Sequence, residues 1–147
     1  MAKPVLLLTL IDGVEEGGVN DNHFIIDDWL EGRYLMLMGM YARSSQFDSP
    51  TGIEKPFWHL ESDGFWHLRL KDAGMQRGKN HTPTKAWLKE NVDYARLDEE
   101  LWILLQNRAW RLRLRDYIVE HQLTRDGAKV RFVAEGLGIL VALVLTA

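Results

Sequence analysis

The stretch Pro56–Leu70 reads PFWHLESDGFWHLRL, and it is the part of the sequence that most directly predicts a fold. Two aromatic-rich runs flank Asp63-Gly64, a pair that favours the positive φ angles of a tight turn between strands. Pairing the two runs gives a ribbon that is largely apolar on both faces. We therefore expect an aromatic-rich β-hairpin that other elements cover on both sides.

Helical patterns surround this stretch. The first is the apolar run Pro4–Ile11, where proline suits a first helical turn and Gly13 or Gly17-Gly18 would end the helix. Further helices are expected over residues 24–43, 84–90, 98–106 and 108–121, because their apolar residues recur at helical spacing. Asp98 is a good N-cap, and the arginines of the last helix are expected to face outward. The predicted fold class is α+β, a mainly helical single domain with one aromatic-rich β-hairpin.

Length and composition limit the class of protein. A chain of 147 residues with 46% hydrophobic and 27% charged residues is one folded domain, which we assign to residues 1–135, followed by an apolar tail, 136–147. The absence of cysteine excludes disulfides, cysteine-liganded metals and a cysteine nucleophile, and it fits a cytoplasmic protein. No secretory signal is expected, and the uncharged tail is too short to span a bilayer, so no membrane partner is expected.

The net charge of −3 hides a segregation of charges. Residues 12–31 contain seven acids and no Lys or Arg, whereas residues 69–89 contain six Lys or Arg and a single acid, Asp72. A second basic cluster consists of Arg108, Arg111, Arg113 and Arg115. An acidic protein can therefore still present one positive face, although solvated helix and loop surfaces explain such blocks equally well.

Catalytic and metal-binding patterns are missing from the sequence. No two of the five histidines have the i, i+4 spacing of a helical metal site, and there is no phosphate-binding glycine loop or Gly-x-Ser-x-Gly elbow. Asn80-His81 suggests an HNH nuclease, but the residues that follow do not match that metal site. We therefore expect no catalytic residue, no metal, no cofactor and no enzymatic activity.

Four motifs in this order resemble the sulfur-binding domain of restriction endonucleases that recognise phosphorothioate-modified DNA. They are Lys3-Pro4 before the apolar run, KPFWHL at Lys55–Leu60, DGFWHL at Asp63–Leu68 and LDEELWILL at Leu97–Leu105. The resemblance covers roughly residues 3–119. In that family the domain is usually fused to an HNH nuclease domain, which we do not find in this chain, so cleavage is expected from another domain or chain.

The resemblance implies a reader of double-stranded DNA in which sulfur replaces one non-bridging phosphate oxygen in the Rp configuration. Its sulfur pocket is shallow and apolar with a basic rim. Mapped here, the pocket consists of Lys3 and Pro4 on one side and of Lys55, Pro56 and His59 on the other. Lys3 stands where the family often has arginine, so the charge is kept and the bidentate geometry is lost.

The chemistry of such a pocket is consistent with selection for sulfur. Sulfur is less strongly hydrated than a phosphate oxygen, so an apolar pocket penalises it less, by about 1–3 kcal/mol. The remaining affinity would come from phosphate contacts and from groove contacts such as arginine to guanine or asparagine to adenine. The expected DNA-binding residues are Arg69, Lys71, Gln76, Arg77, Lys79, Asn80, His81 and Lys85.

Two alternatives remain beside a recognition module of a restriction-modification system. One is a truncated HNH-type endonuclease, for which the missing ligand set is unfavourable. The other is a protein-interaction or assembly domain that uses the apolar tail, Gly136–Ala147. DNA binding would fall steeply with salt, which separates it from assembly through apolar surface.

Overall fold

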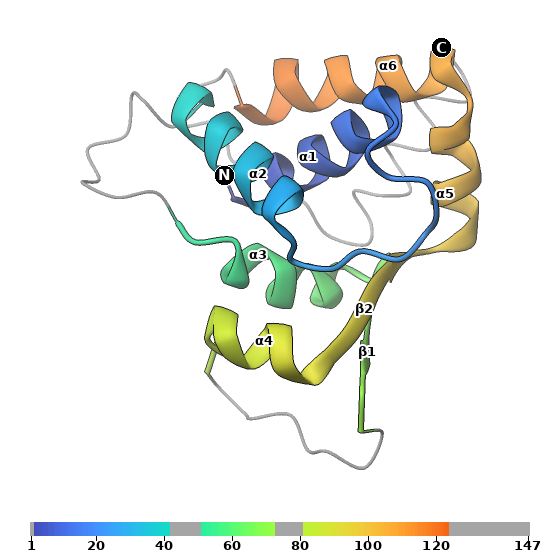
Figure 1. The fold of residues 1–147 in the computed structure, drawn as a ribbon. Helices are drawn as coiled ribbons and strands as arrows, with labels where there is room; N and C mark the ends of the chain where they lie inside the picture. The colour runs from blue at the N-terminus through green and yellow to red at the C-terminus, as the bar shows by residue number, and fades with distance from the viewer. Residues whose placement is uncertain (1, 42–50, 73–80, 124–147) are drawn as a thin grey trace.

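The computed structural model describes residues 2–41, 51–72 and 81–123, and these form a mainly helical α+β unit with one pair of antiparallel strands, as predicted (Figure 1). The helices are α1 (Ala2–Glu16), α2 (Asp28–Tyr41), α3 (Glu54–His59), α4 (Lys85–Asn91), α5 (Glu99–Gln106) and α6 (Arg108–Ile118). A 3-10 turn, η1 (Leu60–Asp63), follows α3, and a π turn, η2 (Val119–Leu123), follows α6. The strands are β1 (Trp66–Leu70) and β2 (Val92–Leu97).

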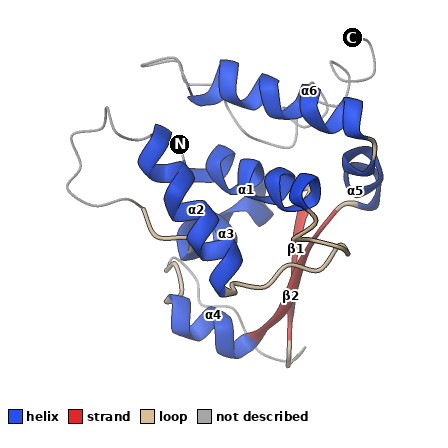
Figure 2. Cartoon of the chain, turned by 45° about the horizontal axis from the view of Figure 1, so that its top comes forward, coloured by secondary structure: helices blue, strands red, loops and turns tan. Residues whose placement is uncertain are grey.

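Helix α1 is the centre of the core. Every residue from Pro4 to Gly13 is buried, because α2, α3 and α6 all pack against this helix (Figure 2). A helix that is covered on several sides has no need of a polar face, which explains the continuous apolar run in its sequence. None of the helices within the described residues is both long enough and apolar enough to cross a membrane.

The position of the strand pair differs from the prediction. Strand β1 pairs with β2, with Trp66 opposite Leu97 and Leu68 opposite Ala95, and the chain between the two strands includes α4. The expected first strand of the hairpin is instead α3 and η1. Pro56 lies in the first turn of α3, where a missing N–H costs nothing. Gly64 has the expected positive φ of 94°, but it ends η1 and does not join two strands.

Two side-chain rings fix α3 against β1. Phe57 and Trp66 are both buried, and their rings meet edge to face with centroids 5.4 Å apart. Trp66 Nε1 also donates to the Phe57 carbonyl oxygen at 2.9 Å, so the indole N–H is satisfied inside the core. The aromatic residues of the motif therefore join a helix to a strand, and not two strands to each other.

The second helix begins later than expected. Phe24 forms an isolated antiparallel bridge with Ala95 of β2, through hydrogen bonds of 2.7 and 2.8 Å between their backbone groups. Helix α2 then begins at Asp28, and Asp27 Oδ1 accepts from the Leu30 N–H at 2.8 Å as an N-cap. The apolar residues that suggested one helix from Phe24 thus belong partly to the bridge with β2 and partly to α2.

Candidate nucleic-acid interface

The residues of the expected sulfur pocket come from two elements that pack together, α1 and α3. Lys55 and His59 are exposed, whereas the rings of Pro4 and Pro56 are buried. We call this region, formed by Lys3, Pro4, Lys55, Pro56 and His59, the α1–α3 junction. Its basic side chains reach the surface, whereas its two prolines are buried.

Lys3 is already paired in the structure. Its Nζ lies 3.1 Å from Asp63 Oδ2, and the Asp63 side chain is only 2% exposed, against 31% for Lys3. This carboxylate oxygen makes no hydrogen bond among the described residues, so the ammonium group is its one charge partner there. Lys3 therefore connects the start of α1 to the end of η1, and only part of its charge is available to a ligand.

His59 connects the junction to the segment that leads into α4. Its Nε2 lies 2.6 Å from Thr82 Oγ1, at hydrogen-bond distance. Two residues later, Thr84 caps α4 by accepting from the Trp87 N–H at 3.1 Å. Thr82, within the basic segment 69–89, is thus held close to α3, just before α4 begins.

The expected DNA-binding residues have different environments. Arg69 donates to Tyr94 Oη at 3.1 Å and lies 4.0 Å from an Asp93 carboxylate oxygen. Lys85 Nζ donates to Glu31 Oε2 at 2.7 Å, and this bond raises the pKa of Lys85. His81 and Lys71 are exposed. Gln76, Arg77, Lys79 and Asn80 lie outside the described residues.

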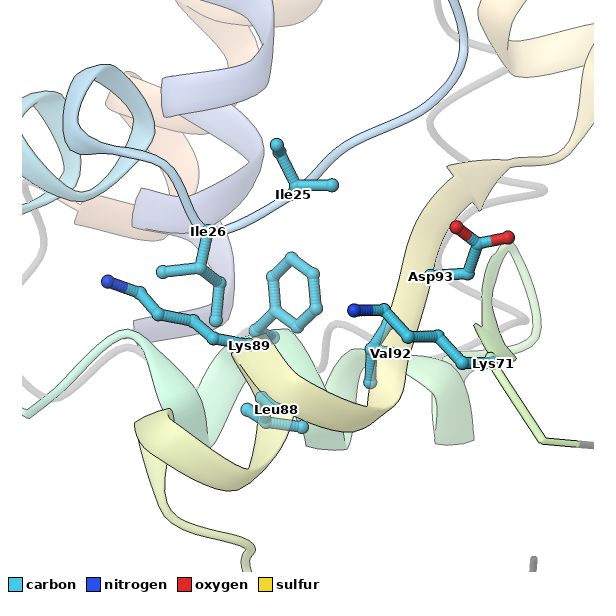
Figure 3. Close-up of a pocket in the computed structure, with 8 residues that line it drawn as sticks. Ile25, Ile26, Lys71, Leu88, Lys89, Val92 and Asp93 are labelled. Atoms are coloured by element: carbon cyan, nitrogen blue, oxygen red, sulfur yellow. The ribbon is translucent and has the colours of Figure 1, made fainter.

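A cleft of about 390 Å³ is lined by residues from both ends of the basic segment 69–89 (Figure 3). Its walls are mostly apolar, and its charged residues are two lysines and one aspartate; the lining residues are Ile25, Ile26, Phe57, Lys71, Leu88, Lys89, Val92 and Asp93. We call it the Lys71–Lys89 cleft. Figure 3 shows the two lysines on either side of Val92. Neither lysine has an acidic partner among the described residues, in contrast to Lys85.

A second cleft, of about 230 Å³, has the opposite charge. It is lined by Asp21 and Asp27 together with His23, and no lysine or arginine lines it. His23 stacks on Tyr94, with ring centroids 3.8 Å apart and planes inclined by 20°. Two carboxylates and one histidine make this cleft unsuitable for a phosphate backbone.

Three of the four arginines of the second basic cluster, Arg108, Arg111 and Arg115, form ion pairs with acids of α1. Arg111 is buried, 8% exposed, and it donates to Glu15 Oε1 at 2.8 and 3.0 Å and to the Leu105 carbonyl oxygen at 2.7 Å. Arg115 donates to Asp12 at 2.9 Å. The prediction that the arginines of α6 all face outward is therefore wrong for Arg111. A buried arginine is tolerated because a carboxylate and a carbonyl together satisfy its donors.

Acids of α1 also form ion pairs with α2. Arg33 donates to Asp12 Oδ2 at 3.1 Å and to both carboxylate oxygens of Glu16. Hydrogen bonds from Arg111 and Arg108 hold the pKa of Glu15 below its ordinary value, and those from Arg33 do the same for Glu16. The acidic and basic blocks of the sequence thus neutralise each other between α1, α2 and α6.

One hydrogen-bonded pair of side chains had no signal in the sequence. Asp98 occupies the N-cap position of α5 as expected, but its side chain makes no capping bond. Its Oδ1 instead accepts from His67 Nε2 of β1 at 2.5 Å. Residues 31 positions apart, on elements whose pairing was not predicted, could not be joined from spacing alone.

Within the described ranges, no group of three or more His, Asp or Glu side chains is arranged to hold a metal ion. Searches with the whole chain find no matching protein-family model and no matching curated protein. The resemblance to the sulfur-binding domain therefore rests on the motifs quoted above.

Proposed function

We propose that this chain binds double-stranded DNA carrying an Rp phosphorothioate and serves as the recognition module of a modification-dependent restriction system. Cleavage would belong to an HNH nuclease in another domain or chain. One observation carries the proposal: the start of α1 and the KPFWHL motif, far apart in the sequence, lie on helices that pack together. His59 then links this junction to the basic segment through Thr82.

The distribution of charge supports binding to a polyanion. Several acids of the block at residues 12–31 form ion pairs within the fold. Asp12, Glu15 and Glu16 pair with arginines of α2 and α6, and Glu31 pairs with Lys85. Lys55, Lys71 and Lys89 have no acidic partner among the described residues. Cations are thus left for an external ligand on α3, on α4 and at the end of β1, although the whole chain carries −3. Arg96 of β2 and Arg113 of α6 also have no acidic partner among the described residues, so the unpaired cations are not confined to this side.

The buried prolines give the α1–α3 junction its selectivity in this proposal. Pro56 is buried in the structure, so contact with the modified phosphate requires part of its ring to become accessible on binding. A weakly hydrated sulfur then covers an apolar ring at less cost than an oxygen does. A difference of about 1–3 kcal/mol corresponds to roughly 5- to 150-fold tighter binding of the modified duplex.

The test is a fluorescence-polarisation titration of one short duplex with an Rp phosphorothioate against its unmodified twin at the same salt. Pro56→Ala removes the ring while keeping a helix-compatible residue, and we expect it to lower the preference for sulfur. Pro56→Glu should abolish the preference, but Pro56 is buried, so circular dichroism must first show that the variant folds. Arg113→Gln is the matched control, because Arg113 is exposed on α6 and stacks over Trp110. Equal affinity of the unaltered protein for both duplexes would refute the proposal.

A second candidate function, self-association, has a different observation in its favour. Leu35, Met36 and Met40 are 43%, 51% and 52% exposed on one face of α2. Gly32 and Gly39 are also exposed, and a Cβ added to either would meet no atom within 4 Å. Such a face suits close packing of another helix. Light scattering of the protein and of Met36→Glu would test it, since a monomer in both cases excludes assembly through α2.

A further inference from the structure

We propose that the Lys71–Lys89 cleft is a second contact with the DNA backbone, separate from the α1–α3 junction. Each ammonium group would contact one backbone phosphate of the same strand, and the carbon face of the deoxyribose between these phosphates would lie on the apolar wall. This inference rests on the proposed function, because it assigns the cleft to the same duplex. It adds affinity without adding selectivity for sulfur.

The two lysines differ from the other described cations of the basic segment. Arg69 lies near Asp93, and Lys85 is bonded to Glu31, so both already have a negative partner. Lys71 and Lys89 have none among the described residues, and both line the same cleft. Two exposed, unpaired ammonium groups along one concave surface suit neighbouring phosphates of one DNA strand, since lysine binds phosphate as a point charge.

The positions of both lysines are fixed by the backbone. The Lys71 N–H donates to the Asn91 carbonyl oxygen at 2.8 Å, at the end of the β1–β2 ladder. Lys89 lies in the last turn of α4, which runs directly into β2. The distance between the two side-chain origins is therefore set by a strand pair and a helix, and a ligand that joins the lysines does not have to order a loop first.

The apolar wall suits a sugar rather than a bare ion. Ile25, 53% exposed at the edge, offers most of the accessible carbon surface, while Ile26, Phe57, Leu88 and Val92 are almost completely buried and keep the wall rigid. A volume of about 390 Å³ is much larger than one phosphate group needs, and it leaves room for the attached deoxyribose. Because the cleft adjoins the basic segment, one strand of a duplex could contact both.

Asp93 carries the one negative charge among the residues that line the cleft, so its removal should strengthen DNA binding. Its carboxylate is half-exposed at the rim and lies 4.0 Å from the Arg69 guanidinium. Removing this negative charge would favour a phosphate in the cleft and would also release Arg69 for the backbone. Asp93→Asn should therefore tighten binding of both duplexes about two- to threefold.

The experiment measures the affinity for the modified and the unmodified duplex over a series of salt concentrations. For Lys71→Gln/Lys89→Gln we expect roughly tenfold weaker binding of both duplexes at moderate salt, with the preference for sulfur unchanged. The slope of log K against log salt should decrease by about two, because each lysine neutralises about one phosphate charge. Ile25→Glu should also weaken both, while its neutral counterpart Ile25→Gln and the distant Arg113→Gln should keep the slope of the unaltered protein.

The outcomes separate this inference from the proposed function. An unchanged affinity and slope in the double lysine variant would overturn the inference, whatever the preference for sulfur. A double variant that loses the preference would overturn it too, because the cleft would then hold the modified phosphate itself. Equal binding of both duplexes by the unaltered protein would refute the sulfur reader alone, and the slope would still decide the cleft. Binding of neither duplex would refute both.

Discussion

Replacing Lys3 with methionine should destabilise the fold, because it leaves the Asp63 carboxylate buried without a cation. Lys3 Nζ lies 3.1 Å from Asp63 Oδ2, and that oxygen has no hydrogen bond among the described residues. Loss of one partner of a fully buried pair costs about 3–5 kcal/mol. Lys3 is 31% exposed, so water screens the site in part, and we expect the free energy of unfolding to fall by about 2 kcal/mol.

Urea denaturation followed by tryptophan fluorescence measures this loss, with linear extrapolation to water. Asp63→Asn should cost less, because the ammonium group of Lys3 can then turn to solvent, and Lys3→Met/Asp63→Asn should recover about 1 kcal/mol relative to Lys3→Met. Lys55→Met is the control for removing an exposed lysine and should change stability by less than about 0.5 kcal/mol. If Lys3→Met is as mild as this control, the buried pair is not what holds the start of α1.

Three other perturbations follow from the fold. Acid should destabilise the protein, because the pKa values of Glu15 and Glu16 are lowered in the folded state. The stability that these two carboxylates contribute is complete above their ordinary pKa of 4.5 and is lost as the pH falls through the lowered values. Urea midpoints measured across this pH range would show the loss. Tyr34→Phe should cost about 1 kcal/mol in urea, since the buried Tyr34 hydroxyl donates to the Thr51 carbonyl oxygen at 2.7 Å; an unchanged midpoint would mean that this bond contributes nothing. Gly64→Ala should lower the thermal midpoint through a cost of about 1 kcal/mol, because φ is 94° there, whereas the same change at the exposed Gly39 should not lower it.

The helices were predictable wherever one element accounts for the local pattern. The apolar run after Pro4, the short helix expected over residues 84–90 and the end of α5 at Gln106 all depend on residues within a few positions of each other. The Asp63-Gly64 signal was also correct at the level of the backbone, since Gly64 has a positive φ. A positive φ ends a helix as readily as it turns a hairpin, and only the tertiary contact of Phe57 with Trp66 decides between the two.

The candidate site was less predictable because charge pairing is a property of the fold. The basic cluster of α6 resembled a free positive face, yet Arg111 and Arg115 bind acids of α1. Lys71 and Lys89, by contrast, are ordinary members of a basic segment in the sequence, and their unpaired state depends on where β1 and α4 end. Spacing along the chain carries no information on which distant carboxylate a given cation will meet.

The bond between the Lys71 N–H and the Asn91 carbonyl closes a loop at its base. The chain between these residues leaves the strand pair and returns to it at the same place, so its length does not affect how β1 and β2 align. Lengthening a closed loop is inexpensive, about 0.6 kcal/mol for each doubling. Segments of other lengths and sequences could therefore join Asp72 to His81 without redesigning the core. Under the proposed function, a change of base preference could be engineered in this part of the chain without loss of the fold.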